Sequence, residues 1–141
     1  MKYQIVTSIH IQAHSSLIWD VLTDFKNYPK WNPYIKSIKG KVEVGEKFQV
    51  QMDTMSFRPV ALVYDKNKEF TWLGKLVFSG VFDGRHSFFL KEHEDGTTTL
   101  HQNESFEGLL VRLMKKRLET DIIKKFNQMN EKLKELAESK R

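Results

Sequence analysis

Residues 81–126 read VFDGRHSFFLKEHEDGTTTLHQNESFEGLLVRLMKKRLETDIIKKF, and they contain two different hydrophobic periods. Up to Phe106, apolar side chains alternate with polar ones, which is typical of half-buried strands. From Leu109 onward they recur every three or four residues, which is typical of an amphipathic helix. The change of period at Gly108 therefore predicts paired strands followed by a long C-terminal helix.

The helical pattern runs to the end of the sequence with no proline or glycine to interrupt it. About 30 residues of helix correspond to roughly 45 Å. The apolar stripe consists of Leu110, Leu113, Met114, Leu118, Ile122, Phe126, Met129, Leu133 and Leu136. We expect the helix to cross the concave face of a sheet and to bury five of these side chains: Leu110, Leu113, Leu118, Ile122 and Phe126.

Upstream of residue 81, the alternating period also predicts strands. Turn-forming residues recur between the alternating segments at regular intervals. We predict strands at 2–12, 34–41, 46–54, 58–65, 69–75, 81–93 and 97–107. Pro59 should lie at a strand start, an edge or a bulge because it has no N–H to donate. The run is too long and regular for strand–helix–strand units, so an antiparallel meander is expected.

Between the first and second strands, the pattern is briefly helical. Ser15 and Ser16 can cap a helix, and apolar residues follow at helical spacing as far as Phe25. Pro29 and Pro33 then end the helical segment, because residues before proline avoid the helical region. With 141 residues, 40% of them hydrophobic, the chain is predicted to be a single α+β domain over residues 1–141.

The composition excludes several classes of protein. The chain has no cysteine, which excludes disulfide scaffolds, iron–sulfur clusters and thiol nucleophiles. His10, His14 and His93 are expected to be solvated, so a metal site lacks converging ligands. We expect no metal and no cofactor. Without a signal-like start or a long apolar run, a cytoplasmic protein is expected.

The positive net charge of +5 lies in the C-terminal segment. Residues 109–141 contain twice as many basic as acidic side chains, whereas the preceding residues are balanced. A basic helix can bind nucleic acid or anionic lipid, but a solvated helix face is the commoner meaning. We therefore expect no nucleic-acid partner, no stable membrane insertion, and a monomer or weak homodimer.

A curled sheet contacts a long helix only in part, so a ligand cavity can remain between them. Trp31, in a proline-flanked segment, is a candidate for the rim or lid of such a cavity. The other apolar candidates for ligand binding are Phe48, Met52, Trp72, Phe88, Phe106, Leu110, Leu113 and Met114. Alternatively, the aromatic side chains among them fill the core.

His86 and Glu104 are the two ionisable residues on an apolar face. If residues 94–96 form a three-residue hairpin loop, His86 faces Glu104 across an antiparallel pair, with Cβ atoms about 5 Å apart. Three interpretations remain open. The pair can be a mutually satisfied structural pair, it can orient a ligand hydroxyl or carbonyl, or it can perform general acid–base catalysis.

Seven segments in order resemble the SRPBCC superfamily, and within it the bacterial polyketide cyclase/dehydrase and lipid-transport branch. They are Ile11-x-Ala13, residues 19–25 (WDVLTDF), Tyr28-Pro29-x-Trp31-Asn32-Pro33, Phe70-x-Trp72-x-Gly74, Phe82-x-Gly84-x-His86-x-Phe88, His101-x-x-Glu104-x-Phe106-x-Gly108 and Phe126-x-x-Met129-Asn130-x-x-Leu133-Lys134. The resemblance implies a helix-grip fold related to START and pollen-allergen-like proteins: a curved antiparallel sheet of about seven strands wrapped around the C-terminal helix. It implies little about function, because members of the superfamily use unrelated ligands.

Three functional hypotheses follow. The leading one is a non-catalytic protein that binds a small apolar or amphipathic molecule, lipid- or polyketide-like, between sheet and helix. The second is a cyclase- or dehydratase-like enzyme that uses His86 and Glu104. The third is an interaction module that uses the basic C-terminal helix.

Overall fold

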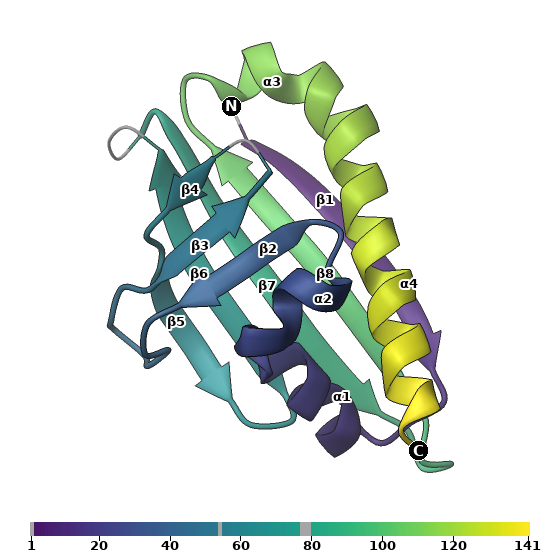
Figure 1. Ribbon diagram of the computed structural model, residues 1–141. Helices are drawn as coiled ribbons and strands as arrows, with labels where there is room; N and C mark the ends of the chain where they lie inside the picture. The colour runs from purple at the N-terminus through teal and green to yellow at the C-terminus, as the bar shows by residue number, and fades with distance from the viewer. Residues whose placement is uncertain (1, 54, 77–79) are drawn as a thin grey trace.

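The computed structural model describes residues 2–53, 55–76 and 80–141 of the chain. Five strands form one antiparallel sheet in the order β1-β8-β7-β6-β5. Their bounds are β1 Lys2–Ile11, β5 Val60–Asp65, β6 Glu69–Leu76, β7 Phe82–Glu92 and β8 Thr98–Glu107. A second antiparallel sheet contains β2 (Ile35–Lys39), β3 (Gln49–Met52) and β4 (Ser56–Phe57). In Figure 1 this smaller sheet lies in front of β6 and β7.

Helices cover the same side of the large sheet. The segment after β1 contains α1 (Ser15–Thr23), η1 (Phe25–Asn27) and α2 (Tyr28–Trp31). The C-terminal helix contains α3 (Val111–Arg117), a π-helical turn η2 (Leu118–Ile122) and α4 (Ile123–Ser139). In Figure 1, α4 runs along the β1 side of the sheet, with α3 at one end and α1 at the other. This architecture confirms the predicted α+β helix-grip fold.

The strands near Pro59 differ from the prediction. Within the predicted strand 46–54, the structure has only the shorter strand β3, and Thr54 lies outside the described residues. Pro59 separates β4 from β5, because it cannot donate to a ladder; its carbonyl instead accepts the N–H of Phe48 at 3.1 Å. The expected single sheet of about seven strands is therefore one of five strands and one of three.

The β7–β8 hairpin has the predicted register. His93 and Thr97 flank the loop, and the N–H of His93 donates to the Thr97 carbonyl at 2.7 Å. His86 pairs with Glu104 across the two strands. The even-numbered residues 82–90 of β7 and 98–106 of β8 are buried, so this face of the hairpin points toward the helix.

The first turns of the C-terminal helix bury a different face from the one expected. Val111 and Leu118 are buried, whereas Leu110 and Leu113 are 38% and 79% exposed. The expected burial of these two leucines is wrong. Helical spacing is satisfied equally well by two sets of residues, 110/114/118 and 111/114/118. Periodicity alone therefore does not tell whether Leu110 or Val111 is on the buried face of the helix. Further along, Phe126 is fully buried as predicted, and Ile122 is partly buried.

Candidate functional site

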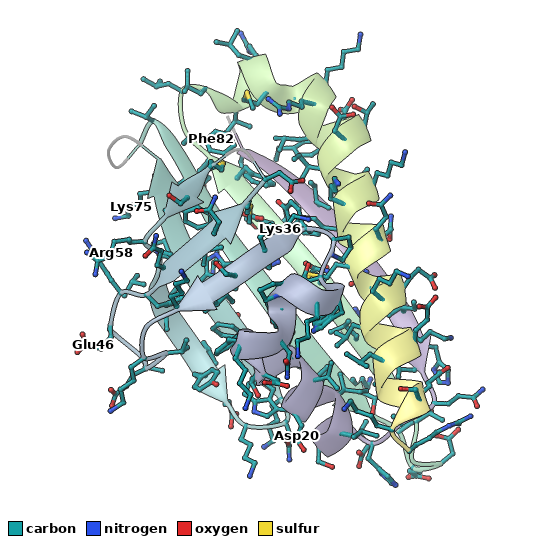
Figure 2. All side chains as sticks on the ribbon, viewed as in Figure 1. Asp20, Lys36, Glu46, Arg58, Lys75 and Phe82 are labelled. Atoms are coloured by element: carbon teal, nitrogen blue, oxygen red, sulfur yellow. The ribbon has the colours of Figure 1, made fainter. Side chains whose placement is uncertain are left out.

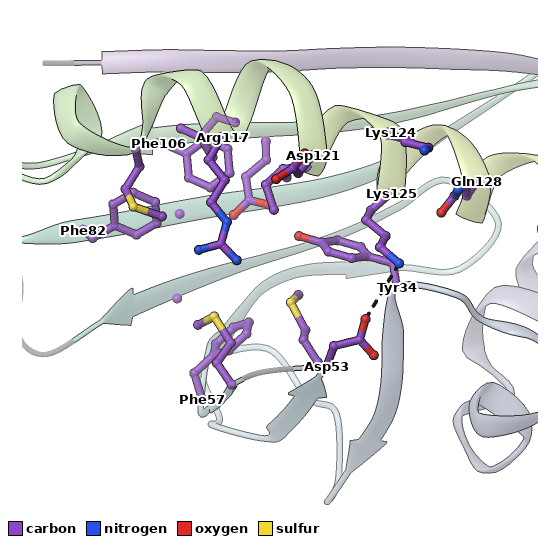
Figure 3. Close-up of a pocket in the computed structure, with 18 residues that line it drawn as sticks. Tyr34, Asp53, Phe57, Phe82, Phe106, Arg117, Asp121, Lys124, Lys125 and Gln128 are labelled. Atoms are coloured by element: carbon purple, nitrogen blue, oxygen red, sulfur yellow. Dashed lines mark ion pairs between the residues drawn. The ribbon is translucent and has the colours of Figure 1, made fainter.

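A pocket of about 520 Å³ lies between the start of the C-terminal helix and the sheets (Figure 3). Its walls come from β6, β7 and β8 on one side, from α3, η2 and α4 on another, and from the β3–β4 hairpin opposite the helix. In Figure 2, Phe82 lies at the end of the large sheet nearest α3, where this pocket is located. The lining residues are Tyr34, Met52, Asp53, Met55, Phe57, Gly74, Phe82, Gly84, Glu104, Phe106, Met114, Arg117, Leu118, Asp121, Ile122, Lys124, Lys125 and Gln128.

Two glycines hollow out the sheet beneath this pocket. Gly74 on β6 pairs with Gly84 on β7, so neither strand places a side chain there. A Cβ added to Gly84 would overlap the Glu104 carboxylate, and one added to Gly74 would lie 3.0 Å from a Phe57 ring carbon. Glycine at residue 84 is therefore what allows Glu104 to lie flat against β7 beside the pocket.

The first prediction concerns Gly84→Ala. The new methyl group should displace the Glu104 carboxylate and lower the free energy of unfolding by about 1 to 3 kcal/mol through the lost hydrogen bond. Gly74→Ala is the matched comparison, because it presses on the Phe57 ring and leaves Glu104 in place. Urea denaturation of both variants measures the difference. Equal losses would contradict this account of Gly84.

Glu104 connects the pocket to a buried imidazole. Its Oε1 lies 2.9 Å from Nδ1 of His86, and both side chains are buried. The His86 ring stacks on Trp72 with centroids 4.6 Å apart and contacts Phe126 at 4.9 Å. The packing of these two rings against the imidazole holds it in position.

A chain of hydrogen bonds behind His86 assigns one of its protons. Gln102 Nε2 donates to Asn130 Oδ1 at 2.7 Å and to the Phe126 carbonyl at 3.3 Å. Gln102 Oε1 is therefore an acceptor, and it lies 3.0 Å from His86 Nε2, which must carry a proton. Asn130 in turn donates to Thr7 Oγ1 at 2.9 Å, and Thr7 donates to the Gln102 carbonyl at 2.6 Å. Every member of this chain has a partner.

One further proton is shared between His86 and Glu104. Because Nε2 is already protonated, the Nδ1···Oε1 bond needs a proton on one of its two atoms. The pair is thus either an imidazolium with a carboxylate or a neutral imidazole with a carboxylic acid. In both forms Glu104 presents to the pocket a group that can accept or exchange a proton.

Tyr34 adds a hydroxyl to the pocket. The side chain of Asn32 accepts the backbone N–H groups of Tyr34 and Ile35 at 2.9 and 2.8 Å, which fixes the turn into β2. In Figure 3 the Tyr34 hydroxyl points into the pocket. Burial raises its pKa above the ordinary value of 10.0, and the nearby Glu104 raises it further. Tyr34 therefore remains a hydrogen-bond donor at neutral pH.

The second prediction is a loss of stability in alkaline solution. Burial also raises the pKa of Tyr28 above 10.0. The unfolded chain releases these phenolic protons before the folded chain does, so the free energy of unfolding should fall as the pH rises above 10.0. Denaturation at a series of pH values should show this fall, and Tyr34→Phe should reduce it. Phenolate absorbance from Tyr28 and Tyr34 while the protein is still folded would contradict the prediction.

Charged side chains surround the mouth of the pocket. Asp53 lies 3.8 Å from Lys125 and 3.3 Å from Lys36, so it links the β3–β4 hairpin to α4 (Figure 3, dashed line to Lys125). Arg117 points into the pocket in the same view, and Asp121 also belongs to the lining. The mouth is therefore polar, while Phe57, Phe82, Phe106, Met114 and Leu118 make the interior apolar.

The structure separates the predicted ligand-binding residues into three groups. Met52, Glu104, Phe106 and Met114 line the pocket. A closed cluster beside it contains Phe48, Trp72, His86 and Phe88, all buried. Trp31 lies with Leu136 beside a smaller pocket near the end of α4, and Leu110 and Leu113 are exposed on the α3 side. Their roles in ligand binding remain predictions.

Sequence reasoning did not identify Tyr34, Gly74, Gly84 or Gln102 as parts of the site. Gln102 had a usable signal, because it lies two residues from Glu104 on the same inward face of β8. The glycines gave no such signal, since their contribution is the absence of a side chain. Within residues 2–53, 55–76 and 80–141, no three His, Asp or Glu side chains converge as metal ligands would.

Fold and site together define a helix-grip protein with a pocket between its sheets and its C-terminal helix. The chain belongs to the polyketide cyclase / dehydrase and lipid transport family, whose model matches residues 2–138. The resemblance noted in the sequence is thereby confirmed. No curated protein matches the chain in sequence. Among the described residues, no helix is both long and apolar enough to cross a bilayer.

Solved structures support the fold. A protein from Mesorhizobium loti has 20% identity and a TM-score of 0.75, with 99% of each chain covered. The ZhuI aromatase/cyclase from Streptomyces sp. R1128 has 13% identity and a TM-score of 0.78, over 98% of this chain and 94% of that one. A START superfamily protein from Mycobacterium smegmatis has 16% identity and a TM-score of 0.69, over 94% of this chain and 98% of that one. At these identities the likeness concerns fold alone.

Proposed function

We propose that this protein binds a small apolar or amphipathic molecule in the pocket between the sheets and the C-terminal helix. The observation that carries the proposal is the pocket itself, whose 520 Å³ lie within the range of small-molecule sites. The apolar body of a ligand would contact Phe57, Phe82 and Phe106. A hydroxyl or carbonyl would face Tyr34 and Glu104, two polar side chains in the lining of the pocket.

Neighbouring residues on one helix allow a controlled test. Met114 lines the pocket, whereas the adjacent Leu113 points to solvent. In Met114→Trp the larger side chain should fill part of the cavity, so that the ligand can no longer bury all of its apolar surface there. This loss should cost about 1.4 kcal/mol or more, which weakens binding of a fluorescent fatty acid at least about tenfold. Leu113→Trp should leave the affinity unchanged. The proposal fails if wild-type protein does not bind any of a panel of fatty acids, phenolics and apolar dyes.

Native mass spectrometry of protein purified from its own host would identify the ligand class directly. A bound mass should be present in wild-type protein and in Leu113→Trp, and absent from Met114→Trp. The fluorescence of Trp72 offers a second readout of ligand binding. Its ring stacks on His86, and His86 is hydrogen-bonded to Glu104. Ligands that contact Glu104 should therefore change tryptophan fluorescence, and Trp72→Phe should remove that part of the response.

The second candidate function is a cyclase- or dehydratase-like reaction, favoured by one observation. Glu104 lines the pocket and shares a proton with His86, so the pocket contains a group that can accept or deliver a proton. Incubation with a bound ligand, followed by liquid chromatography and mass spectrometry, separates the two functions. Dehydration would lower the ligand mass by one water, whereas cyclisation alone would keep the mass and change the chromatographic retention. Either product, if it forms with wild-type protein but not with Glu104→Gln when both bind the ligand equally, would establish catalysis. A ligand with unchanged mass and unchanged retention would leave binding as the function.

A further inference from the structure

The first turn of α3 and the two residues before it expose three leucines. Leu109 is 81% exposed, Leu113 79% and Leu110 38%. Among the described residues, they make up half of the large hydrophobic side chains that are exposed, yet all three lie within a stretch of five residues. Scattered surface leucines need no explanation, but a cluster of this kind marks an interaction site. We call residues 109–113 the leucine tip.

Backbone contacts hold the leucine tip in this position. The N–H groups of Leu109 and Leu110 donate to the carbonyls of Gly80 and Val81 at 3.2 and 3.0 Å. Gly108 has a φ of 130°, and a Cβ there would overlap the backbone of Val81. The chain therefore leaves β8 along a fixed path, and the leucines are presented to solvent by a defined backbone.

From the leucine tip to Leu118, the charges along the chain are positive. Arg112, Lys115 and Lys116 are all exposed, and no acidic residue occurs between Gly108 and Leu118. Lys115 has one exposed carboxylate nearby, Glu119, at 3.7 Å. Leucines interleaved with basic residues are the pattern of segments that lie in the interface of an anionic membrane, where the leucines enter the acyl region and the basic groups stay among the headgroups.

We propose that the leucine tip docks this protein onto the surface of an anionic lipid bilayer. Charge complementarity favours this partner over a second copy of the chain, because a two-fold contact would bring Arg112, Lys115 and Lys116 against the same residues of the other copy. Three leucines are also too few for a stable dimer interface, which buries about 800 Å² on each partner. A bilayer needs no shaped partner surface.

Docking at this tip would place the pocket beside the membrane. Met114, Arg117 and Leu118 line the pocket and follow directly after the leucine tip along the same helix. An amphipathic molecule could then pass between bilayer and pocket over a short path. The docking proposal does not depend on what the pocket binds, because the exposed leucines and the basic groups alone carry it.

Vesicle flotation with the full chain tests the proposal. Wild-type protein should float with phosphatidylcholine vesicles that contain phosphatidylglycerol, should bind pure phosphatidylcholine weakly, and should lose binding as salt is raised. The double variant Leu109→Ser/Leu113→Ser, and separately Lys115→Gln/Lys116→Gln, should each weaken binding at least about tenfold. Val6→Ser/Val44→Ser is the matched control, since these exposed valines lie elsewhere on the chain and should not matter. All these side chains are exposed, so thermal melts should remain close to that of wild type.

A fluorescent label gives a second readout of insertion. The chain has no cysteine, so Leu113→Cys creates a unique attachment site for an environment-sensitive dye. Its emission should shift to the blue with anionic vesicles, whereas the same dye on Val44→Cys should not respond. The proposal is overturned if wild type does not bind anionic vesicles, if the double leucine variant binds as well as wild type, or if the valine control loses binding equally. It is also overturned if the wild type forms a dimer that the double leucine variant abolishes.

Discussion

Replacing Phe126 with alanine should lower the free energy of unfolding by about 3 to 5 kcal/mol. The side chain is fully buried on α4 and touches the rings of His86 and Tyr34, with centroids 4.9 and 5.4 Å away. Its removal leaves a cavity between the helix and the sheet that the surrounding side chains fill only in part. Since a domain of this size is stable by about 5 to 15 kcal/mol, the loss should be large but measurable by urea denaturation.

Leu113→Ala is the matched control on the same helical segment. Both residues were expected to lie on the buried stripe, yet Leu113 is 79% exposed. Its replacement should change the free energy of unfolding by no more than about 0.5 kcal/mol. A loss comparable to that of Phe126→Ala would mean that α3 packs on the sheet through another face.

The contrast between these residues shows how far the sequence predicts the fold. Alternation of apolar and polar residues identifies the strands, and apolar residues at helical spacing identify the helix that follows. The short loop at residues 94–96 determines which residues of β7 and β8 are paired. Helical spacing also fits Leu110, however, as well as it fits Val111. The choice between them depends on where the helix leaves the end of the sheet and on the π-helical turn at 118–122, and neither leaves a local sequence signal.

The site could be predicted only where side chains create it. His86 and Glu104 were found because two ionisable residues on an apolar face need an explanation. The hollow above Gly74 and Gly84 depends on two missing side chains that meet only when β6 pairs with β7. Of the aromatic residues predicted as pocket walls, Phe106 lines the pocket, whereas Phe48 and Trp72 fill the neighbouring core, because a large side chain can fill a cavity as readily as it can line one.

His86→Ala should destabilise the fold more than Glu104→Ala. Loss of the imidazole leaves Gln102 Oε1 without its donor and opens a gap between Trp72 and Phe126, so we expect a cost of about 3 to 5 kcal/mol. Glu104 lies at the wall of the pocket, where water can replace its carboxylate. Its removal should therefore cost about 1 to 3 kcal/mol.

A double substitution with apolar residues, His86→Phe with Glu104→Leu, then separates structure from function. It should recover part of the cost of the single changes, because neither ionisable partner remains unpaired. A deficit of about 1 to 3 kcal/mol should persist, since Gln102 is still held by Asn130 and its Oε1 has no donor. If the pair orients a ligand, this variant should lose affinity for ligands with a hydroxyl or carbonyl but retain affinity for hydrocarbon analogues. Unchanged preference for oxygen-bearing ligands, measured by the same dye displacement as for wild type, would show that His86 and Glu104 serve the fold alone.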